Sequence, residues 1–363
     1  MVIGAPRQSG IPVEEPDHEL ELDEAIINSL PAHCKVLSVG YGGPSAWIKT
    51  IKIVVKLEDG SIAKFFKKGA SGTIGADMMK GAFEADKALY EAIPDRVPKP
   101  VAWGTYVSNP DIHFYMAEYV EMGDDAPSPQ NGPPLFWSFT LLAWAIPGGK
   151  FGFHVTHIWP TRSTIHDFLG SPLGSADESL FDREESVNGP DEALTKLRTA
   201  YFDKAIPRYL RPLESDGRSI TPCLIHSDLW LGNIKPRVST GELCLFDSCA
   251  YWGHNEADLA ICYNKRYKLG AVCSMEYTRQ ANEADPDASF VKDLEVEFDE
   301  RNALYAIKFH VLLSIMYLDR DDGYFRKVLM DELRMILEKI EFDSGISKPE
   351  PPASSEVKSP SHL

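Results

Sequence analysis

The segment LIHSDLWLGNIKP, residues 224–236, places an acid and an amide at a spacing that can do chemistry. Asp228 is followed by Asn233, and a second acid, Asp247, ends the next apolar run, GELCLF. Two carboxylates and an amide on neighbouring loops can jointly bind a divalent cation and orient a hydroxyl group. Phosphoryl transfer requires both functions. These residues therefore predict a phosphoryl-transfer site.

The spacing around Asp228 favours catalysis over a simple turn. The pattern H-x-D-x-x-x-x-N, with a further Asp after the next strand, is the arrangement of a kinase catalytic loop and its metal-binding Asp. Either Asp228 or Asn233 alone would be explained by turn formation, because Asp and Asn favour turns. The ordered set indicates a kinase, with His226 as a scaffold of the loop rather than a proton carrier.

A kinase site also needs a lysine on an upstream strand and an acid on the following helix that pairs with it. We predict that Lys67, on the strand SIAKFFKK, contacts the nucleotide phosphates and that Glu84, in GAFEADKALYEA, pairs with it. Side chains alternate along a strand, so Lys64 and Lys68 point to the opposite face. Either of these could instead be the working lysine.

Backbone groups are expected to hold the rest of the nucleotide. The run SVGYGGPSA, residues 38–46, lies just before the first clear strand, where glycines let backbone N–H groups approach phosphates. A plain tight turn explains these glycines, Gly40, Gly42 and Gly43, equally well. By position, Glu118 and Val120 in MAEYV would present backbone groups to an adenine edge.

The elements that carry these residues fall into a sheet-rich first third and a helical remainder. Residues 51–57 and 61–68 read as a hairpin, and a helix over about 76–92 and a Pro-punctuated link, VPKPVAWG, precede a strand at 113–120. From about residue 123 the periodicity is mostly helical, with short strands near 223–225 and 242–246. We predict a disordered tail over 1–18, an N-lobe over 19–121, a helical C-lobe over 122–343 and a second tail over 344–363.

The composition of the chain argues against some classes of binding partner. Thirty-seven basic against 54 acidic residues give a formal net charge of -17, which argues against nucleic acid or an anionic membrane as a partner. The longest apolar run, LFWSFTLLAWAI at 135–146, is shorter than the ~20 residues that span a bilayer, so a buried helix is expected there. Six cysteines without zinc-like spacing and an N-terminus without an apolar signal core favour a cytoplasmic protein with reduced thiols.

Five segments have counterparts in one known family. They are RVPKPVAWG (96–104), FYMAEYVEM (114–122), GKFGFH (149–154), LIHSDLWLGN (224–233) and LFDSCAYWGHNEADLAI (245–261). In this order they resemble the fructosamine kinase, or ketosamine 3-kinase, family, which includes the fungal and plant protein-ribulosamine 3-kinases. The resemblance implies an α+β, bilobal, protein-kinase-like fold with a small antiparallel-sheet N-lobe, one helix in that lobe, and a larger helical C-lobe.

The resemblance also implies an activity. It is ATP- and Mg²⁺-dependent phosphorylation of the sugar 3-hydroxyl of ketosamines on glycated lysines, leading to deglycation. By position, Asp228 would take or orient the hydroxyl proton, Asn233 and Asp247 would bind the metal, and Lys67 held by Glu84 would bind the phosphates. Glycated proteins or free glycated amines would be the substrates of a monomer or weak homodimer.

Each of four other residues in the matching segments has two possible roles, one in the site and one in the structure. Asp258 would hydrogen-bond the catalytic loop or cap a helix. His254 and Glu256 would line the substrate pocket or order their turn. Trp230 would stack on a sugar or pack in the core.

The chain departs from the family in three places. Ser227 stands where the family usually has Gly, LLAWAIPGG replaces a helix that typically ends in Leu-His, and the segment after GKFGFH is unfamiliar. This atypical region, 123–190, leaves two alternatives open: another small-molecule kinase of the aminoglycoside and choline kinase group, and a non-catalytic nucleotide-binding protein. The final residues Ser361, His362 and Leu363 resemble the peroxisomal S-K-L address, an alternative to the cytoplasm.

Overall fold

A computed structural model describes residues 21–43, 48, 50–123, 175–215, 222–263, 297–317 and 323–344. The predicted tail 1–18, the predicted tail 344–363 apart from Ser344, and the buried helix expected at 135–146 lie outside these residues. The segment after GKFGFH also lies outside them up to residue 174, whereas its remainder forms the helix Ser175–Asn188. Among the described helices, none has the length and apolarity needed to cross a membrane.

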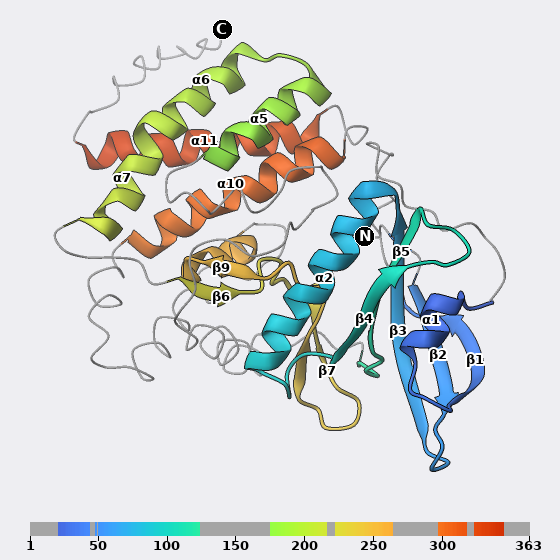
Figure 1. Ribbon diagram of the computed structural model, residues 1–363. Coiled ribbons are helices and arrows are strands. Elements are labelled where there is room, and N and C mark those ends of the chain that lie inside the picture. The colour runs from blue at the N-terminus through green and yellow to red at the C-terminus, as the bar shows by residue number, and fades with distance from the viewer. Residues whose placement is uncertain are drawn as a thin grey trace, which may run out of the picture.

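Within the described residues, five antiparallel strands form the N-terminal sheet in the order β1-β2-β3-β5-β4 (Figure 1). Their bounds are β1 Lys35–Tyr41, β2 Thr50–Lys56, β3 Ile62–Ser71, β4 Pro100–Thr105 and β5 Ile112–Glu118. The predicted hairpin is β2 and β3. Strand β1 extends into the run SVGYGGPSA, where we predicted a loop, so that Gly40 belongs to a strand.

Strand β4 also corrects a prediction, because the link VPKPVAWG was not expected to contain a strand. Pro100 is its first residue, and β4 lies at an edge of the sheet. Proline lacks an N–H to donate, and this loss is tolerated at the first residue of a strand and in an edge strand. The register shifts between Pro100 and Ala102 in β4, and it shifts likewise between Val36 and Ser38 in the other edge strand, β1.

In the part of the chain that the structure describes, two helices accompany the sheet, where one was predicted. Helix α1, Glu24–Ser29, contributes Ile26 to a core on one face, with Phe65, Phe114 and Met116. Helix α2, Gly72–Ala92, covers the opposite face, where its Met79 packs with other residues of that face, Ala70, Tyr115 and Ala117. The two faces of the sheet therefore have separate cores.

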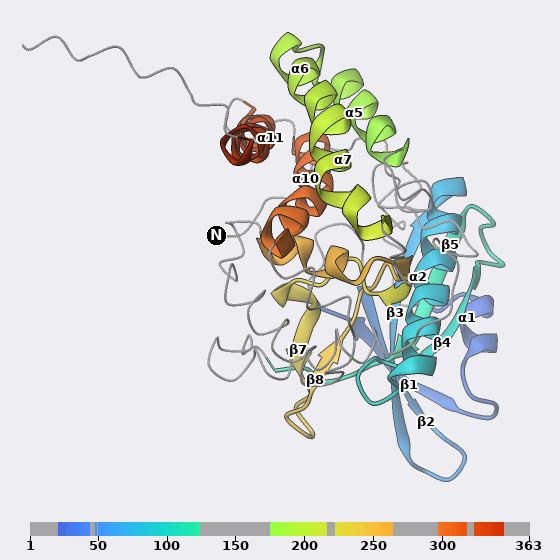
Figure 2. The same ribbon diagram turned by 90° about the vertical axis from the view of Figure 1, so that its left-hand side faces the viewer.

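The C-terminal part combines helices with short strands. The helices are α5 Ser175–Asn188, α6 Glu192–Ala200, α7 Ile206–Leu210, α10 Phe298–Met316 and α11 Tyr324–Asp343, and a π-helical turn, Tyr201–Ala205, joins α6 to α7. Strand β6, Cys223–Ile225, pairs with β9, Tyr251–Gly253, and β7, Ile234–Pro236, pairs with β8, Leu243–Leu245. Figure 2 shows these helices gathered at one end of the molecule and the sheet at the other.

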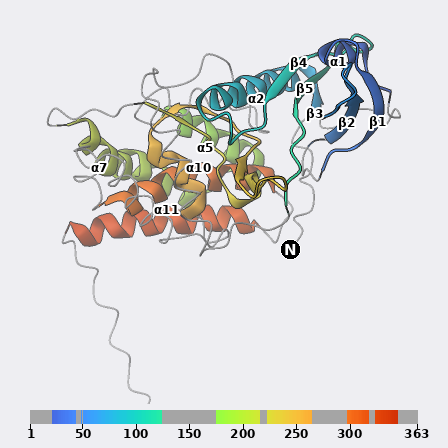
Figure 3. The same ribbon diagram turned by 90° about the horizontal axis from the view of Figure 1, so that it is seen from below.

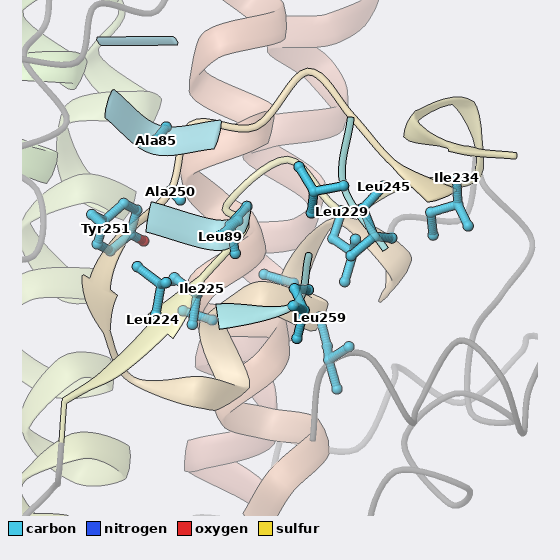
Figure 4. Packing of buried hydrophobic residues seen from close by; sticks show 14 of the residues in the cluster. Ala85, Leu89, Leu224, Ile225, Leu229, Ile234, Leu245, Ala250, Tyr251 and Leu259 are labelled. Carbon is cyan, nitrogen blue, oxygen red and sulfur yellow. The ribbon is translucent and has the colours of Figure 1, made fainter. Parts of the chain in front are cut away.

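Helix α2 lies between the sheet and the C-terminal helices (Figures 1 and 3). Its residues Ala85 and Leu89 share an apolar cluster with Leu224 and Ile225 of β6 and with Leu245 of β8 (Figure 4). Burial of this cluster holds α2 against the strands that flank the loop 226–233. The position of α2 therefore links the sheet to the candidate site.

A second cluster is polar and joins the C-terminal helices. The side chain of Glu184 in α5 is fully buried and accepts hydrogen bonds from Asn188 and from Ser314 of α10. Arg326 of α11 places its Nε 3.1 Å from the Glu184 carboxylate. A buried carboxylate needs such partners, so this set fixes α5, α10 and α11 together.

Asp23 joins helix α1 to the connection between β4 and β5. Its carboxylate accepts hydrogen bonds from the N–H groups of Ala25, Val107 and Ser108 and from the Ser108 hydroxyl. Burial raises the pKa of this carboxyl, but the hydrogen bonds from Ser108, Val107 and Ala25 outweigh it and lower the pKa to about 2. The ionised form therefore stabilises the folded state.

Asp23→Ala is expected to lower the free energy of unfolding by about 1–2 kcal/mol near neutral pH, the usual effect of losing an N-cap. Because the folded pKa is depressed, this contribution is present above the ordinary pKa and disappears as the pH falls toward about 2. Urea unfolding of both proteins at about pH 7 and about pH 3 measures the difference. An equal loss in the exposed control Asp77→Ala, or a difference that grows in acid, would contradict the assignment.

Candidate active site

The loop that we predicted to be catalytic runs from the end of β6 to the start of β7, and it brings Asp228 and Asn233 together. The Asn233 side-chain nitrogen donates to the Asp228 carboxylate over 2.8 Å and to the Asp228 carbonyl oxygen over 2.9 Å. Because the nitrogen is used in this way, the amide oxygen is the atom of Asn233 that can bind a metal. The amide thus orients the acid while it offers an oxygen ligand.

His226 is a scaffold of this loop. The Asp228 N–H donates to its Nδ1, so the proton of the ring lies on Nε2, which donates to the Phe246 carbonyl oxygen over 3.2 Å. Burial lowers the pKa of His226 to about 4, against the opposing effects of Asp247 and Phe246. A neutral imidazole therefore ties the catalytic loop to the segment that precedes Asp247.

Asp258 hydrogen-bonds the loop that contains Asp228, as the first of its two interpretations requires. Its carboxylate accepts the N–H of His226 over 3.1 Å and the N–H of Ser227 over 2.7 Å. Burial raises the pKa of Asp258 to about 6, although both hydrogen bonds and Lys308 oppose the increase. The turn at Ser227, which has φ 68°, is thus held through its backbone from the helical turn Asn255–Tyr263.

Asp228 lies in an environment that disfavours its charge. Burial and the negative charge of Asp247 raise its pKa to about 7, while Asn233 and Lys308 lower it. A cation between two such carboxylates would remove the repulsion. The two acids are therefore arranged so that a cation between them would be favoured.

The lysine that reaches Asp247 is Lys68, which corrects the prediction of Lys67. The Lys68 Nζ lies 2.6 Å from Asp247 Oδ1. Burial opposes the charge of Lys68, but Asp247 and Asp86 together raise its pKa. Lys68 is paired across the sheet with Tyr115, on the α2 face, whereas Lys67 is paired with Met116 and packs near Tyr106 on the other face.

The acid of α2 that faces Lys68 is Asp86, which corrects the prediction of Glu84. Burial raises the pKa of Asp86, and Lys68, Ser248 and Tyr115 oppose that increase. The Tyr115 hydroxyl donates to one oxygen of Asp86 over 2.6 Å, and the Ser248 hydroxyl donates to the other over 2.5 Å. The sequence contained a sign of this role, because Asp86 is seven residues after Met79 and three before Leu89, on the apolar stripe of α2.

Lys64, the third lysine of β3, lies on the same face as Lys68 but further from Asp247 along the strand. It pairs with Glu121 over 2.6 Å, in the segment that follows β5. Lys64 thus belongs to the connection between the two parts of the molecule.

The structure describes the local backbone of the predicted nucleotide-binding glycines and of the segment after β5. A side chain on Gly42 would meet the Ile51 backbone at 2.7 Å, and Gly43 has φ 135°, so the connection from β1 to β2 depends on glycine there. Nothing lies within 4 Å of a side chain built on Gly40. Glu118 donates its N–H to the Lys99 carbonyl oxygen, and in the described part of the chain the N–H of Val120 has no backbone acceptor.

Three candidate substrate residues instead pack within the protein. Glu256 forms a buried bidentate ion pair with Arg301 of α10, at 2.6 and 2.7 Å. His254 is buried, and its Nδ1 lies 2.8 Å from the Tyr305 hydroxyl. The Trp230 ring lies against Gly232 and packs on the apolar cluster that joins α2 to β6 and β8. These contacts favour the ordering of the turn and core packing.

Lys308 of α10 was not predicted. It is 5% exposed and its Nζ lies 3.3 Å from the Ser227 hydroxyl oxygen. Lys308 is 81 positions from Ser227, and no motif connects them. Its place in the helix, among apolar neighbours in YAIKFHVLL, marks it as a lysine that needs partners inside the protein.

The donor set fits magnesium better than a metal held by the protein alone. Within the described residues, no group of three or more His, Cys, Asp and Glu could hold a metal ion. Magnesium is usually bound through one or two carboxylates together with substrate phosphates and water. Asp247 and the amide oxygen of Asn233 are ligands of that kind.

Comparisons of the sequence with known proteins indicate one family. The family model of fructosamine kinase matches residues 193–317. The protein-ribulosamine 3-kinase, chloroplastic, of Oryza sativa subsp. japonica is 28% identical over 204 residues, which are 55% of this chain and 56% of the rice protein. The chain thus spans about half the length of this curated relative. The resemblance to the fructosamine kinase family is confirmed.

Solved structures share the fold. A Thermobifida fusca protein, named as a candidate fructosamine-3-kinase, has a TM-score of 0.60 at 19% identity, over 84% of this chain and 94% of that one. A thermostable mutant of the aminoglycoside phosphotransferase APH(4)-Ia has a TM-score of 0.52 at 13% identity, over 84% and 95%. The protein-kinase-like fold is confirmed, with an antiparallel N-terminal sheet and a helical C-terminal region.

Lys68→Met is expected to weaken the binding of Mg-ATP by about tenfold or more, because a charge-assisted bond is worth about 1.5–3 kcal/mol. The matched control is Lys67→Met, which removes the same charge from the other face of the sheet and should leave the affinity within about twofold. Titration calorimetry with Mg-ATP compares the two variants with the parent protein. Weaker binding in Lys67→Met than in Lys68→Met would reverse our assignment of the lysines.

Proposed function

We propose that this protein is an ATP- and Mg²⁺-dependent kinase that phosphorylates the sugar 3-hydroxyl of ribulosamines or fructosamines attached to lysine. The observation that carries the proposal is the pairing of Asp228 with Asn233 on a loop beside the ion pair of Lys68 and Asp247. Its acceptor class rests on the protein-ribulosamine 3-kinase relative. The phosphorylated adduct would be less stable, so the reaction would free the amine.

In the proposed mechanism, Asp228 orients the sugar hydroxyl and accepts its proton. The Asn233 amide keeps one carboxylate oxygen of Asp228 engaged, which leaves the other oxygen for the substrate. A carboxylate held in place in this way is a suitable general base for a hydroxyl group. Catalysis of this kind depends mainly on positioning the hydroxyl in line with the phosphate.

The nucleotide would be held by groups from both sides of the site. Lys68 would contact the phosphates, and Asp86 would keep its ammonium group in place. The N–H of Val120 and the carbonyl oxygen of Glu118 would meet the adenine edge, and the connection around Gly42 and Gly43 would cover the phosphates. Asn233 and Asp247 would hold Mg²⁺, which when bound neutralises charge on the phosphates.

The first test is ATP consumption with Mg²⁺ and a ribulosamine-lysine or fructosamine-lysine acceptor. Acceptor-dependent turnover is expected, and Asp228→Asn should lower kcat by about 10²–10⁴-fold, because it removes the base and keeps the shape. Asp77→Ala, an exposed change on α2, is the matched control.

Aminoglycosides and choline serve as competing acceptors in the same assay. Turnover with only these compounds would reject the ketosamine as substrate and would keep the kinase. Turnover that survives Asp228→Asn would reject the role of Asp228. Mg-ATP binding without turnover on any acceptor would instead favour a non-catalytic nucleotide-binding protein.

A further inference from the structure

Ser227 occupies a backbone conformation that suits glycine. Its φ is 68°, in the left-handed region, where a residue with a side chain is held only by its surroundings. The next residue is Asp228, so the conformation of Ser227 sets where the catalytic carboxylate points. A loop with serine here needs contacts that a loop with glycine would not need.

The structure provides those contacts on both sides of Ser227. Its N–H donates to Asp258, and the residue is 2% exposed. Its hydroxyl oxygen accepts a hydrogen bond from the Lys308 ammonium group over 3.3 Å. The Tyr251 side chain also hydrogen-bonds to Ser227. Asp258 acts on the backbone, which any residue at this position would offer, whereas Lys308 acts on the side chain that only serine supplies.

Lys308 is buried between aromatic rings and carboxylates. Its ammonium group is 5.7 Å from the centre of the Tyr251 ring and 5.1 Å from that of the Phe309 ring. The carboxylates of Asp228 and Asp258 both interact with its charge. Helix α10, which carries Lys308, is itself fixed to the site through the ion pair of Arg301 with Glu256. Lys308 is therefore anchored independently of the loop that it contacts.

We propose that Lys308 is a positioning residue, which holds the Ser227 side chain and thereby keeps the catalytic loop in the left-handed turn that presents Asp228. The proposal rests on the proposed kinase function for the role of Asp228. Its physical content is a coupling between positions 308 and 227. Glycine at 227 would adopt the turn without a side-chain contact, so the lysine would then matter less.

The experiment compares Lys308→Met in two backgrounds, the parent protein and Ser227→Gly. In the parent background kcat should fall on the order of 10-fold to 100-fold, while KM for ATP stays within about twofold, because the acid is misplaced and the nucleotide site is not. In the Ser227→Gly background the fall should be several times smaller. Lys308→Arg, which keeps the donor, should recover most of the activity.

Two further variants separate positioning from folding. Ser227→Ala removes the acceptor and leaves Lys308 in place, so it should lower kcat in the same direction. Lys327→Met, an exposed lysine of α11, is the matched control for loss of one charge. Urea unfolding is measured for the parent protein, Lys308→Met, Ser227→Gly and the variant with both changes. These four free energies of unfolding give the coupling between positions 308 and 227 without any assay of activity.

An equal fall in kcat in both backgrounds would overturn the proposal, and so would a kcat that Lys308→Met leaves unchanged. If the parent protein does not phosphorylate a ketosamine, the proposed acceptor is wrong. The unfolding experiment then still tests whether Lys308 and Ser227 interact. Coupling in that cycle supports the contact of Lys308 with Ser227, whereas additive effects reject it.

Discussion

The buried carboxylate of Asp86 is the constraint on which the arrangement of the site depends. A charge removed from water is tolerated only where it is fully paired. Asp86 has partners from three places: Tyr115 of the sheet, Ser248 of the segment after Asp247, and the charge of Lys68. These partners meet only when α2, the sheet and the C-terminal strands are correctly assembled. Pairing of one acid therefore makes the geometry of the site a condition of stable folding.

The catalytic loop is held by a different principle. Its acid and amide are neighbours in the chain, but the loop's shape comes from distant residues. Asp258 binds two consecutive backbone N–H groups, and the neutral ring of His226 reaches the Phe246 carbonyl oxygen. Burial of polar groups makes each of these bonds costly to break. These bonds fix the backbone of the loop, and fixed geometry of this kind would serve the positioning catalysis that we propose.

Sequence reasoning placed together residues that are neighbours in the chain, and it failed where a position depends on which face of an element a residue occupies. Asp228, Asn233 and Asp247 were predicted from their spacing, and the structure brings the first two into contact. Alternation along β3 separated Lys67 from Lys68, but it could not say which face meets α2. The buried position of Asp86 could have been predicted, because Asp86 lies on the apolar stripe of its helix. The contact of Lys308 with Ser227 could not, because it exists only after the chain has folded.

The register shifts in β1 and β4 bear on how copies of this protein behave toward one another. These two strands are the edges of the sheet, and each carries an irregularity, between Val36 and Ser38 and between Pro100 and Ala102. A flat edge offers unpaired N–H and C=O groups to a strand of another chain, and a bulge or a proline spoils that template. The sheet that builds the site is therefore shaped to resist edge-to-edge aggregation.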